Sequence, residues 1–428
     1  MLARRRFKTV SGAMWRASAT PCGLAAARGQ RAIALRNSVA ALPAFALERM
    51  PEWDTCPYQL SATDTEPLLL HQLLRIARRA GDYEGLEAWR KLSLGYPSEH
   101  SPKLLEAIAR LHPPLEPAHL AVVVPAEGIS FVFHALGLMP EDHVVVMHPC
   151  YSSLSAVPKS LGCRVTHWRP SAASGRFEPM GLASELRPET KLVVMNLPQN
   201  PTGCLLTSTE FDECTRLCAA RGAHLFVDEM FRGLEHASLG DGGAWPGNGA
   251  LPSACVVYER GITLGGLSKS WGLAGLRLGW VASRDVLFLE RVRELRDYGS
   301  MCASAPSEAL ALLALGSEEA RAAVLSRQRR FLGCGLAAIT TFIHKGGSGL
   351  EWWGGAALPQ AAPTGASMCL LRVPGGATAY AAHLAGAGVM VVPGPIFGLP
   401  DDCIRVGFGR AHVQEGLAIW RRVMQDTQ

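Results

Sequence analysis

Three polar side chains stand just past the ends of predicted strands, and an arginine follows the last of them. Asn200 follows the apolar run KLVVMN, Asp228 follows HLFV, and Lys269 comes shortly after a run that ends in Ile-Thr-Leu. Arg277 stands eight residues beyond Lys269. A lysine amine is a nucleophile for carbonyl groups, a carboxylate pairs with a cation, and an arginine binds phosphate or carboxylate oxygens. Because ligands bind at the carboxyl ends of the strands in open α/β sheets, we expect these residues to share one site.

These residues belong to three motifs: NPTG at 200–203, the strand-ending Asp228, and SK-x₇-R from Ser268 to Arg277. In this order and spacing they resemble the fold-type I pyridoxal-phosphate enzymes, specifically the class I/II aminotransferase family. The resemblance runs from about Pro43 to the C-terminus. The stretches HPCYSSL and GLSKSWGLAGLRLGW are similar to an aspartate-aminotransferase-like branch that includes capreomycidine synthase. The resemblance implies pyridoxal 5′-phosphate as the cofactor and a homodimer whose active site lies between two domains and the partner subunit.

The resemblance assigns the central chemistry to three of these side chains. Lys269 would bind the cofactor's aldehyde covalently, and would then move the substrate's α-proton as general base and acid. Asp228 would pair with the protonated ring nitrogen that the electron sink requires. Asn200 would hydrogen-bond the ring 3′-oxygen and contact the substrate. Taken singly, the same residues could be a solvated lysine, a helix N-cap and an Asn-Pro turn.

The cofactor phosphate requires cations and N–H donors. Arg277 and Ser268 match the family positions for it. The start of the helix predicted after Pro125 would add backbone N–H groups and the positive end of the helix dipole. The residues assigned to that role are Ala126, Glu127 and Gly128, with Glu127 acting through its backbone alone.

Three further residues complete the predicted site. Tyr151 matches the aromatic residue that stacks on the cofactor ring, and core packing is its alternative role. Tyr96 resembles the tyrosine that reaches across the dimer to the partner's phosphate. Arg405 follows PGPIFG at the family's distance, and its guanidinium fork suits a substrate α-carboxylate. The alternative for Arg405 is a surface ion pair.

The chain departs from the family pattern at four positions in three regions. Phe231 replaces the usual tyrosine, whose hydroxyl helps to hold the 3′-oxygen, so we expect a shifted pKa of the lysine-bound cofactor. Gly266 replaces a frequent phosphate-binding serine. Leu105 stands where an arginine is common, and the usual glycine after Tyr96 is absent.

Short apolar runs alternate with helical periodicity, which predicts an α/β fold with a mostly parallel sheet buried on both faces. The expected strands are Leu120–Pro125, His143–Met147, Lys191–Asn196, His224–Val227, Ala254–Tyr258 and Leu278–Ala282. The expected helices include Gly128–Met139, Ser152–Leu161, a long one over Ser307–Cys334 and a terminal one from about His412. The part beyond about residue 305 is expected to form a smaller α+β domain.

The predicted organisation is a transit peptide at 1–47, an N-terminal arm and helix at 48–90 that contribute to the small domain, a large cofactor-binding domain at 91–305 and a small domain at 306–428. Met1–Leu47 holds eight of the 42 Lys and Arg residues and no Asp or Glu. That composition is typical of a mitochondrial or plastid transit peptide, and an unstructured basic tail is the alternative.

The rest of the chain excludes several other classes. It carries 34 basic and 37 acidic side chains, so it offers no basic surface for nucleic acid. It has no apolar run long enough to cross a membrane. The twelve cysteines include no CxxC pair, so we expect free buried thiols and no metal site.

The sequence therefore predicts an aminotransferase that moves an amino group between an α-amino acid and an α-keto acid. An elimination or replacement enzyme, or a cyclase of the capreomycidine-synthase kind, would keep the cofactor and change the reaction. A non-catalytic binding protein with this fold is a third hypothesis. It is weakened because Lys269, Asp228 and Arg405, which such a protein has no need to retain, are all present.

Overall fold

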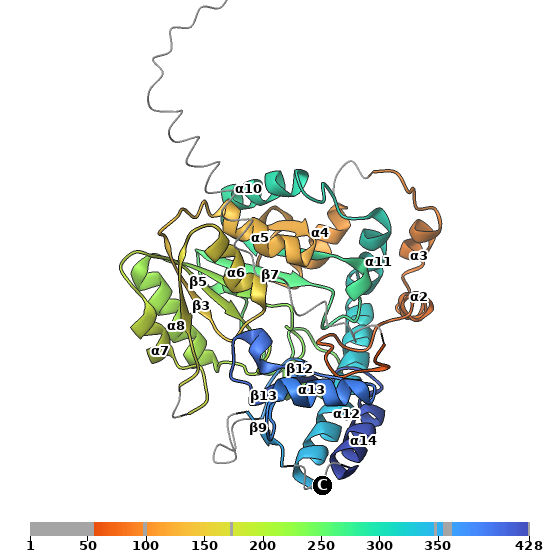
Figure 1. The fold of residues 1–428 in the computed structure, drawn as a ribbon. Coiled ribbons are helices and arrows are strands. Elements are labelled where there is room, and N and C mark those ends of the chain that lie inside the picture. The colour runs from red at the N-terminus through yellow and green to blue at the C-terminus, as the bar shows by residue number, and fades with distance from the viewer. Residues whose placement is uncertain (1–54, 97–100, 172–173, 346–348, 354–361, 427–428) are drawn as a thin grey trace, which may run out of the picture.

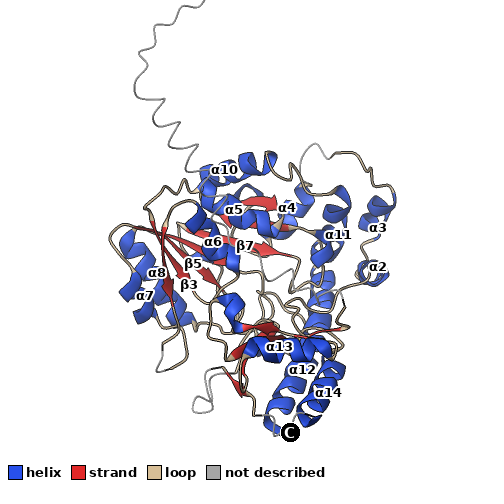
Figure 2. Cartoon of the chain, in the orientation of Figure 1, coloured by secondary structure: helices blue, strands red, loops and turns tan. Residues whose placement is uncertain are grey.

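The computed structural model describes residues 55–96, 101–171, 174–345, 349–353 and 362–426. A seven-stranded sheet forms the centre of the larger domain, and a four-stranded antiparallel sheet lies in the smaller C-terminal domain (Figure 1). Figure 2 shows helices packed around both sheets. The segment predicted as a transit peptide lies outside the described residues.

The large sheet is mostly parallel, as the apolar runs predict. Its strand order is β2-β8-β7-β6-β5-β3-β4, and only β8 runs antiparallel to its neighbours. The strands are β2 (Leu120–Val123), β3 (His143–Met147), β4 (Arg164–Trp168), β5 (Thr190–Asn196), β6 (His224–Asp228), β7 (Gly261–Gly266) and β8 (Gly279–Ser283).

Helices cover both faces of this sheet because successive strand residues point to opposite sides. On β3, Val144 and Val146 pack in one cluster with Val132 of the helix that follows β2. Val145 lies in a different cluster, with Phe211. The helices of this part are α4 (Pro102–Ala109), α5 (Pro125–Ala135), α6 (Ser152–Ser160), α7 (Pro179–Glu185), α8 (Ser208–Arg221), α9 (Ala254–Val257) and α10 (Val286–Asp297).

The smaller sheet has the order β12-β13-β10-β9, and three helices lie in its part of the chain. The strands are β9 (Glu351–Trp352), β10 (Met368–Arg372), β12 (Val392–Pro393) and β13 (Cys403–Gly407). The helices are α12 (Glu318–Lys345), α13 (Ala377–Gly386) and α14 (Val413–Asp426).

The residues between 55 and 90 contact both parts of the molecule. The short strand β1 (Tyr58–Gln59) pairs with β11 (Val389–Met390) of the C-terminal part. The helices α2 (Leu70–Arg79) and α3 (Tyr83–Arg90) instead pack with α11 (Ala305–Leu315), and Leu73 of α2 shares a cluster with residues of the large sheet. The segment between β1 and α2 therefore lies between the two domains.

Two sequence predictions of local structure are wrong. Ala254–Tyr258 is not a strand but contains the short helix α9, because β7, on which it packs, already has β6 and β8 on its two edges. The single helix expected over Ser307–Cys334 is two helices, α11 and α12. The break falls at Gly316 and Ser317, where the Ser317 hydroxyl accepts the amide of Ala320 at 3.1 Å and caps the second helix.

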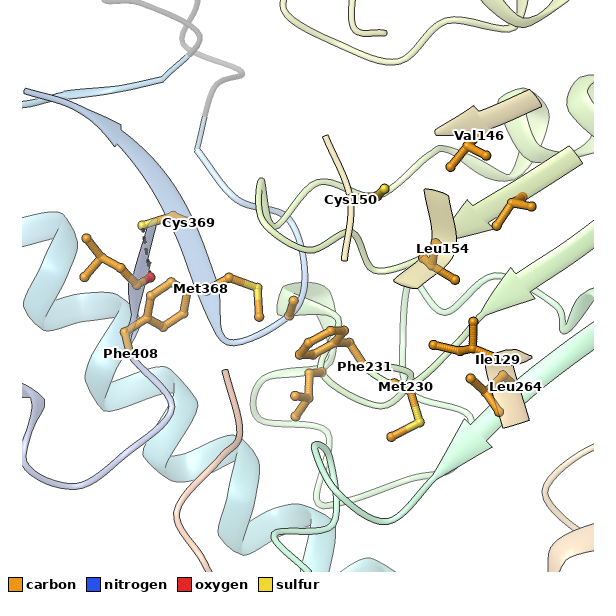
Figure 3. Close-up of a cluster of buried hydrophobic side chains, with 14 of the residues drawn as sticks. Ile129, Val146, Cys150, Leu154, Met230, Phe231, Leu264, Met368, Cys369 and Phe408 are labelled. Atoms are coloured by element: carbon orange, nitrogen blue, oxygen red, sulfur yellow. Dashed lines mark hydrogen bonds between the residues drawn. The ribbon is translucent and has the colours of Figure 1, made fainter. Parts of the chain in front are cut away.

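A single hydrophobic cluster joins the two domains. It extends from Ile129 and Leu264 of the large domain through Phe231 to Met368 and Phe408 of the small one (Figure 3). All of these side chains are buried. The shared core fixes the two domains to each other and so fixes the walls of any cavity between them.

Candidate active site

The ends of β5 and β6 place the first two predicted residues. Asn196 and Asp228 are neighbours in the β5–β6 register. The Asn196 side chain donates to the Asp228 carbonyl at 2.9 Å, and its oxygen accepts the backbone N–H of Asn200 at 2.7 Å. One buried amide therefore ties the NPTG turn to the strand end that carries Asp228.

Asp228 and Lys269 line the same cavity, which has a volume of about 460 Å³. Burial raises the pKa of Asp228 to about 7, although the Met230 amide and the charge of Lys269 act in the opposite direction. Burial likewise lowers the pKa of Lys269 to about 8, against the charge of Asp64. A buried amine with a lowered pKa is the form of lysine that attacks carbonyl groups near neutral pH.

The predicted carboxylate-binding residue Arg405 lies in the same cavity and contacts Asn200. Its guanidinium donates to the Asn200 side-chain oxygen at 3.0 Å and to the Ser61 carbonyl at 2.8 Å. It lies 5.0 Å from the ring centroid of Phe397. Its Nε is buried and makes no hydrogen bond to the described residues. The guanidinium is thus held in place with donors left over for a ligand.

The predicted phosphate-binding residues meet at the start of α5, with one correction. Ser268, Arg277 and Ala126 line the cavity. The N–H of Gly128, however, donates to the Val124 carbonyl at 2.8 Å, so it is not available to a phosphate. A Cβ at Gly128 would lie 2.7 Å from a methyl of Val123, which shows that the glycine is required for packing the helix on the sheet.

Glu127 and the two predicted tyrosines differ in their surroundings. Glu127 does not line the cavity, and its buried Oε2 makes no hydrogen bond to the described residues. Tyr151 lines the cavity next to the N-terminus of α6. Tyr96 is 85% exposed and lies in a separate groove, so it does not meet Lys269 in this chain. Its role toward a partner subunit stays a prediction.

Two of the departures from the family pattern have a structural context. The ring centroid of Phe231 lies 5.7 Å from the Nζ of Lys269, where it supports the amine through a cation–π contact. A Cβ at Gly266 would lie 2.9 Å from the sulfur of Met230. Met230 therefore fills the space that a serine at this position would need.

The sequence did not identify the segment Ser61–Asp64 as part of the site. All four of its residues line the cavity, and so does Arg410, which pairs with Asp64 at 2.9 and 3.0 Å. Thr63 accepts a hydrogen bond from Lys269 at 2.7 Å. No local signal could have revealed this, because 206 residues separate Thr63 from Lys269.

These residues fit pyridoxal phosphate. Lys269 supplies the amine, Asp228 faces the cavity as a buried carboxyl that a protonated ring nitrogen would keep ionised, and Arg277 supplies a cation beside the helix start. The unpartnered Nε of Arg405 is suited to a second anion, the substrate carboxylate. Among the described residues there is no cluster of His, Cys, Asp or Glu that could hold a metal ion.

Comparison with known proteins supports this interpretation. The sequence model of the family "aminotransferase class I and II" matches residues 66–418. Capreomycidine synthase of Streptomyces vinaceus is 33% identical over 295 residues, which cover 65% of this chain and 67% of that protein. Aspartate aminotransferase of Musicola paradisiaca is 27% identical over 219 residues, which cover 49% of this chain and about half (52%) of that protein.

A solved structure extends the similarity to the whole fold. A pyridoxal-phosphate-dependent aminotransferase from Streptococcus suis superposes with a TM-score of 0.78 at 25% identity. The superposition covers 90% of this chain and 99% of that one. This chain and that enzyme therefore share their overall fold.

Proposed function

The chain belongs to the class I and II aminotransferases, which are pyridoxal-phosphate-dependent, and we propose that it transaminates α-amino acids whose carboxylate binds Arg405. The observation that carries the proposal is the single cavity lined by Lys269, Asp228, Asn200 and Arg405. The cofactor, when bound, supplies the aldehyde and the electron sink.

The protein's own residues divide the remaining tasks. Arg405 binds and orients the substrate carboxylate, with Asn200 fixing the guanidinium. Lys269 holds the cofactor and, when free, carries the proton at the substrate α-carbon. Asp228 maintains the positive charge of the ring nitrogen. Asn200, Asp228 and Arg405 are buried and Lys269 is half-buried, and these surroundings, less polar than water, strengthen each electrostatic contact.

A test is to load the protein with pyridoxal phosphate and to add single amino acids. Transamination removes the visible absorbance of the lysine-bound cofactor, and a keto acid restores it. The amino acid that removes the absorbance fastest identifies the donor class. A protein that binds the cofactor through Lys269 and leaves every amino acid and keto acid unchanged would contradict the proposal.

The second candidate reaction is cyclisation or elimination. The similarity to capreomycidine synthase over about two thirds of both chains supports this second candidate. In the same experiment, release of ammonia or a cyclised product, with no effect of added keto acid, would identify it.

We also propose a homodimer, because Tyr96 and other large apolar side chains are exposed near the groove between α3, α4 and α11. The sedimentation coefficient of the cofactor-loaded protein tests this.

The composition of Met1–Leu47 supports import into a mitochondrion or a plastid. Its fusion to a fluorescent reporter tests that proposal and distinguishes the two organelles.

A further inference from the structure

The segment Ser61–Thr65 contacts Lys269 at two places, the side-chain amine and the backbone carbonyl. The Thr63 hydroxyl accepts a hydrogen bond from the ε-amine at 2.7 Å, and the Thr65 hydroxyl donates to the Lys269 carbonyl at 2.6 Å. At the start of the segment, the Ser61 carbonyl accepts a hydrogen bond from Arg405 at 2.8 Å. A single stretch of chain therefore contacts both the amine and the carboxylate-binding guanidinium.

Thr63 is itself held in place by residues of the C-terminal domain. Its carbonyl accepts the Ser367 hydroxyl at 2.6 Å. The neighbouring Asp64 makes a two-point ion pair with Arg410 at 2.9 and 3.0 Å. Two positions further on, the amide of Glu66 donates to the Gly409 carbonyl at 2.9 Å. The Thr63 hydroxyl is thus a fixed anchor, supported by the contacts that a precise site requires.

The surroundings of the amine give Thr63 a specific role. The Phe231 ring, whose centroid lies 5.7 Å from the amine, offers a π face and no hydroxyl. Among the described residues, the Lys269 amine donates its hydrogen bond to the Thr63 hydroxyl. A lysine side chain has several rotatable bonds, so a buried amine without such an anchor would sample several directions.

We propose that Thr63 is a positioning residue whose hydroxyl holds the ε-amine of Lys269 in the direction from which it captures the cofactor and carries the α-proton. The inference rests on the proposed function, because only that function gives the direction of the amine a consequence. Thr63 acts through Lys269 and needs no contact with the substrate. Its contribution is orientation, and errors of about 1 Å in such geometry reduce rates by up to about a hundredfold.

The first test uses the cofactor-free protein and is independent of activity. Competitive acetylation across a pH series, with mass spectrometry of the peptide that contains Lys269, measures the pKa of its amine. Because a hydroxyl oxygen stabilises the ammonium form, Thr63→Val should lower that pKa by about one unit, and Thr63→Ser should restore it. Thr378→Val makes the same chemical change at a helix terminus in the small domain and should leave it unchanged.

An unchanged pKa in Thr63→Val, in a protein whose circular dichroism and melting temperature match the wild type, overturns the inference. If Thr63→Val fails to fold, Thr63→Ala and Thr63→Ser carry the same comparison. A lowered pKa in both Val and Ser variants also overturns it, because the effect would then come from packing.

The second test uses the cofactor-loaded enzyme. Thr63→Val should reduce kcat about tenfold and leave the amino-acid KM unchanged, because Arg405 still binds the carboxylate. A rise in KM with an unchanged kcat would place Thr63 in substrate binding and overturn the inference. A wild-type protein that never attaches pyridoxal phosphate to Lys269 would refute the proposed function. The acetylation result, obtained without cofactor, keeps the two failures distinguishable.

Discussion

Replacing Arg405 by lysine should separate the charge of this residue from its geometry. A guanidinium has five N–H donors and an ammonium has three. Two donors of Arg405 are committed to Asn200 and Ser61. Three therefore remain for a substrate carboxylate in the wild type. In Arg405→Lys only one remains if the same two contacts are kept.

The expected loss follows from that difference. Arg405 is 5% exposed, so water cannot replace the missing donors. Because only one donor remains in the lysine variant, a carboxylate held by two donors in the wild type loses one charge-assisted hydrogen bond. That loss corresponds to about 2 kcal/mol, which is about 30-fold in kcat/KM. An amine that lacks the α-carboxylate makes no such contact, so its kcat/KM should change little.

The assay compares the two substrates in the two proteins. We expect the ratio of kcat/KM for the amino acid over the corresponding amine to fall about 30-fold in Arg405→Lys. Arg372→Lys is the matched control, because Arg372 lies on the adjacent strand β10, is exposed and pairs with Asp402 at 3.6 Å. Equal losses for both substrates, or no loss for the amino acid, would refute the assignment of the carboxylate site to Arg405.

Three further predictions concern the rest of the cavity. Lys269→Ala should abolish the visible absorbance after incubation with pyridoxal phosphate, and borohydride should then leave no cofactor mass on the peptide; a persistent band would contradict the role of this lysine. The pKa of Asp228 is raised from 3.8 to about 7, so its stabilising contribution is lost as the pH rises through about 7. Between pH 5 and 8, the free energy of unfolding of the cofactor-free Asp228→Asn protein, measured by urea denaturation, should therefore rise by about 2 kcal/mol relative to that of the wild type. A pH-independent difference would refute this. Gly203→Ala should destabilise the protein by about 2 kcal/mol more than Gly242→Ala. Both glycines have a φ of +72°, but of the two only Gly203 faces a backbone carbonyl, that of Met368. Equal losses of stability in urea denaturation would show that backbone strain, and not the clash with this carbonyl, determines the cost of the substitution.

The residues that could be predicted are those in local sequence patterns. Asp228 ends an apolar strand, Asn200 and Lys269 each follow one closely, and parallel strands bring their carboxyl ends to one edge. The helix over Ala254–Val257 was missed because the run ACVV is apolar in the same way as a strand. Only the sheet order, with both edges of β7 taken, excludes it from the sheet.

The sequence by itself determined the alternation of strands and helices and the chemical groups at the strand ends, because both depend only on short-range periodicity and residue type. Tertiary structure alone decided that Ser61–Asp64 forms a cavity wall and that Thr63 contacts Lys269 across 206 residues. It also decided the pKa values of Asp228 and Lys269, which arise from burial. Burial and long-range contacts depend on how distant elements pack, and no local pattern records that packing.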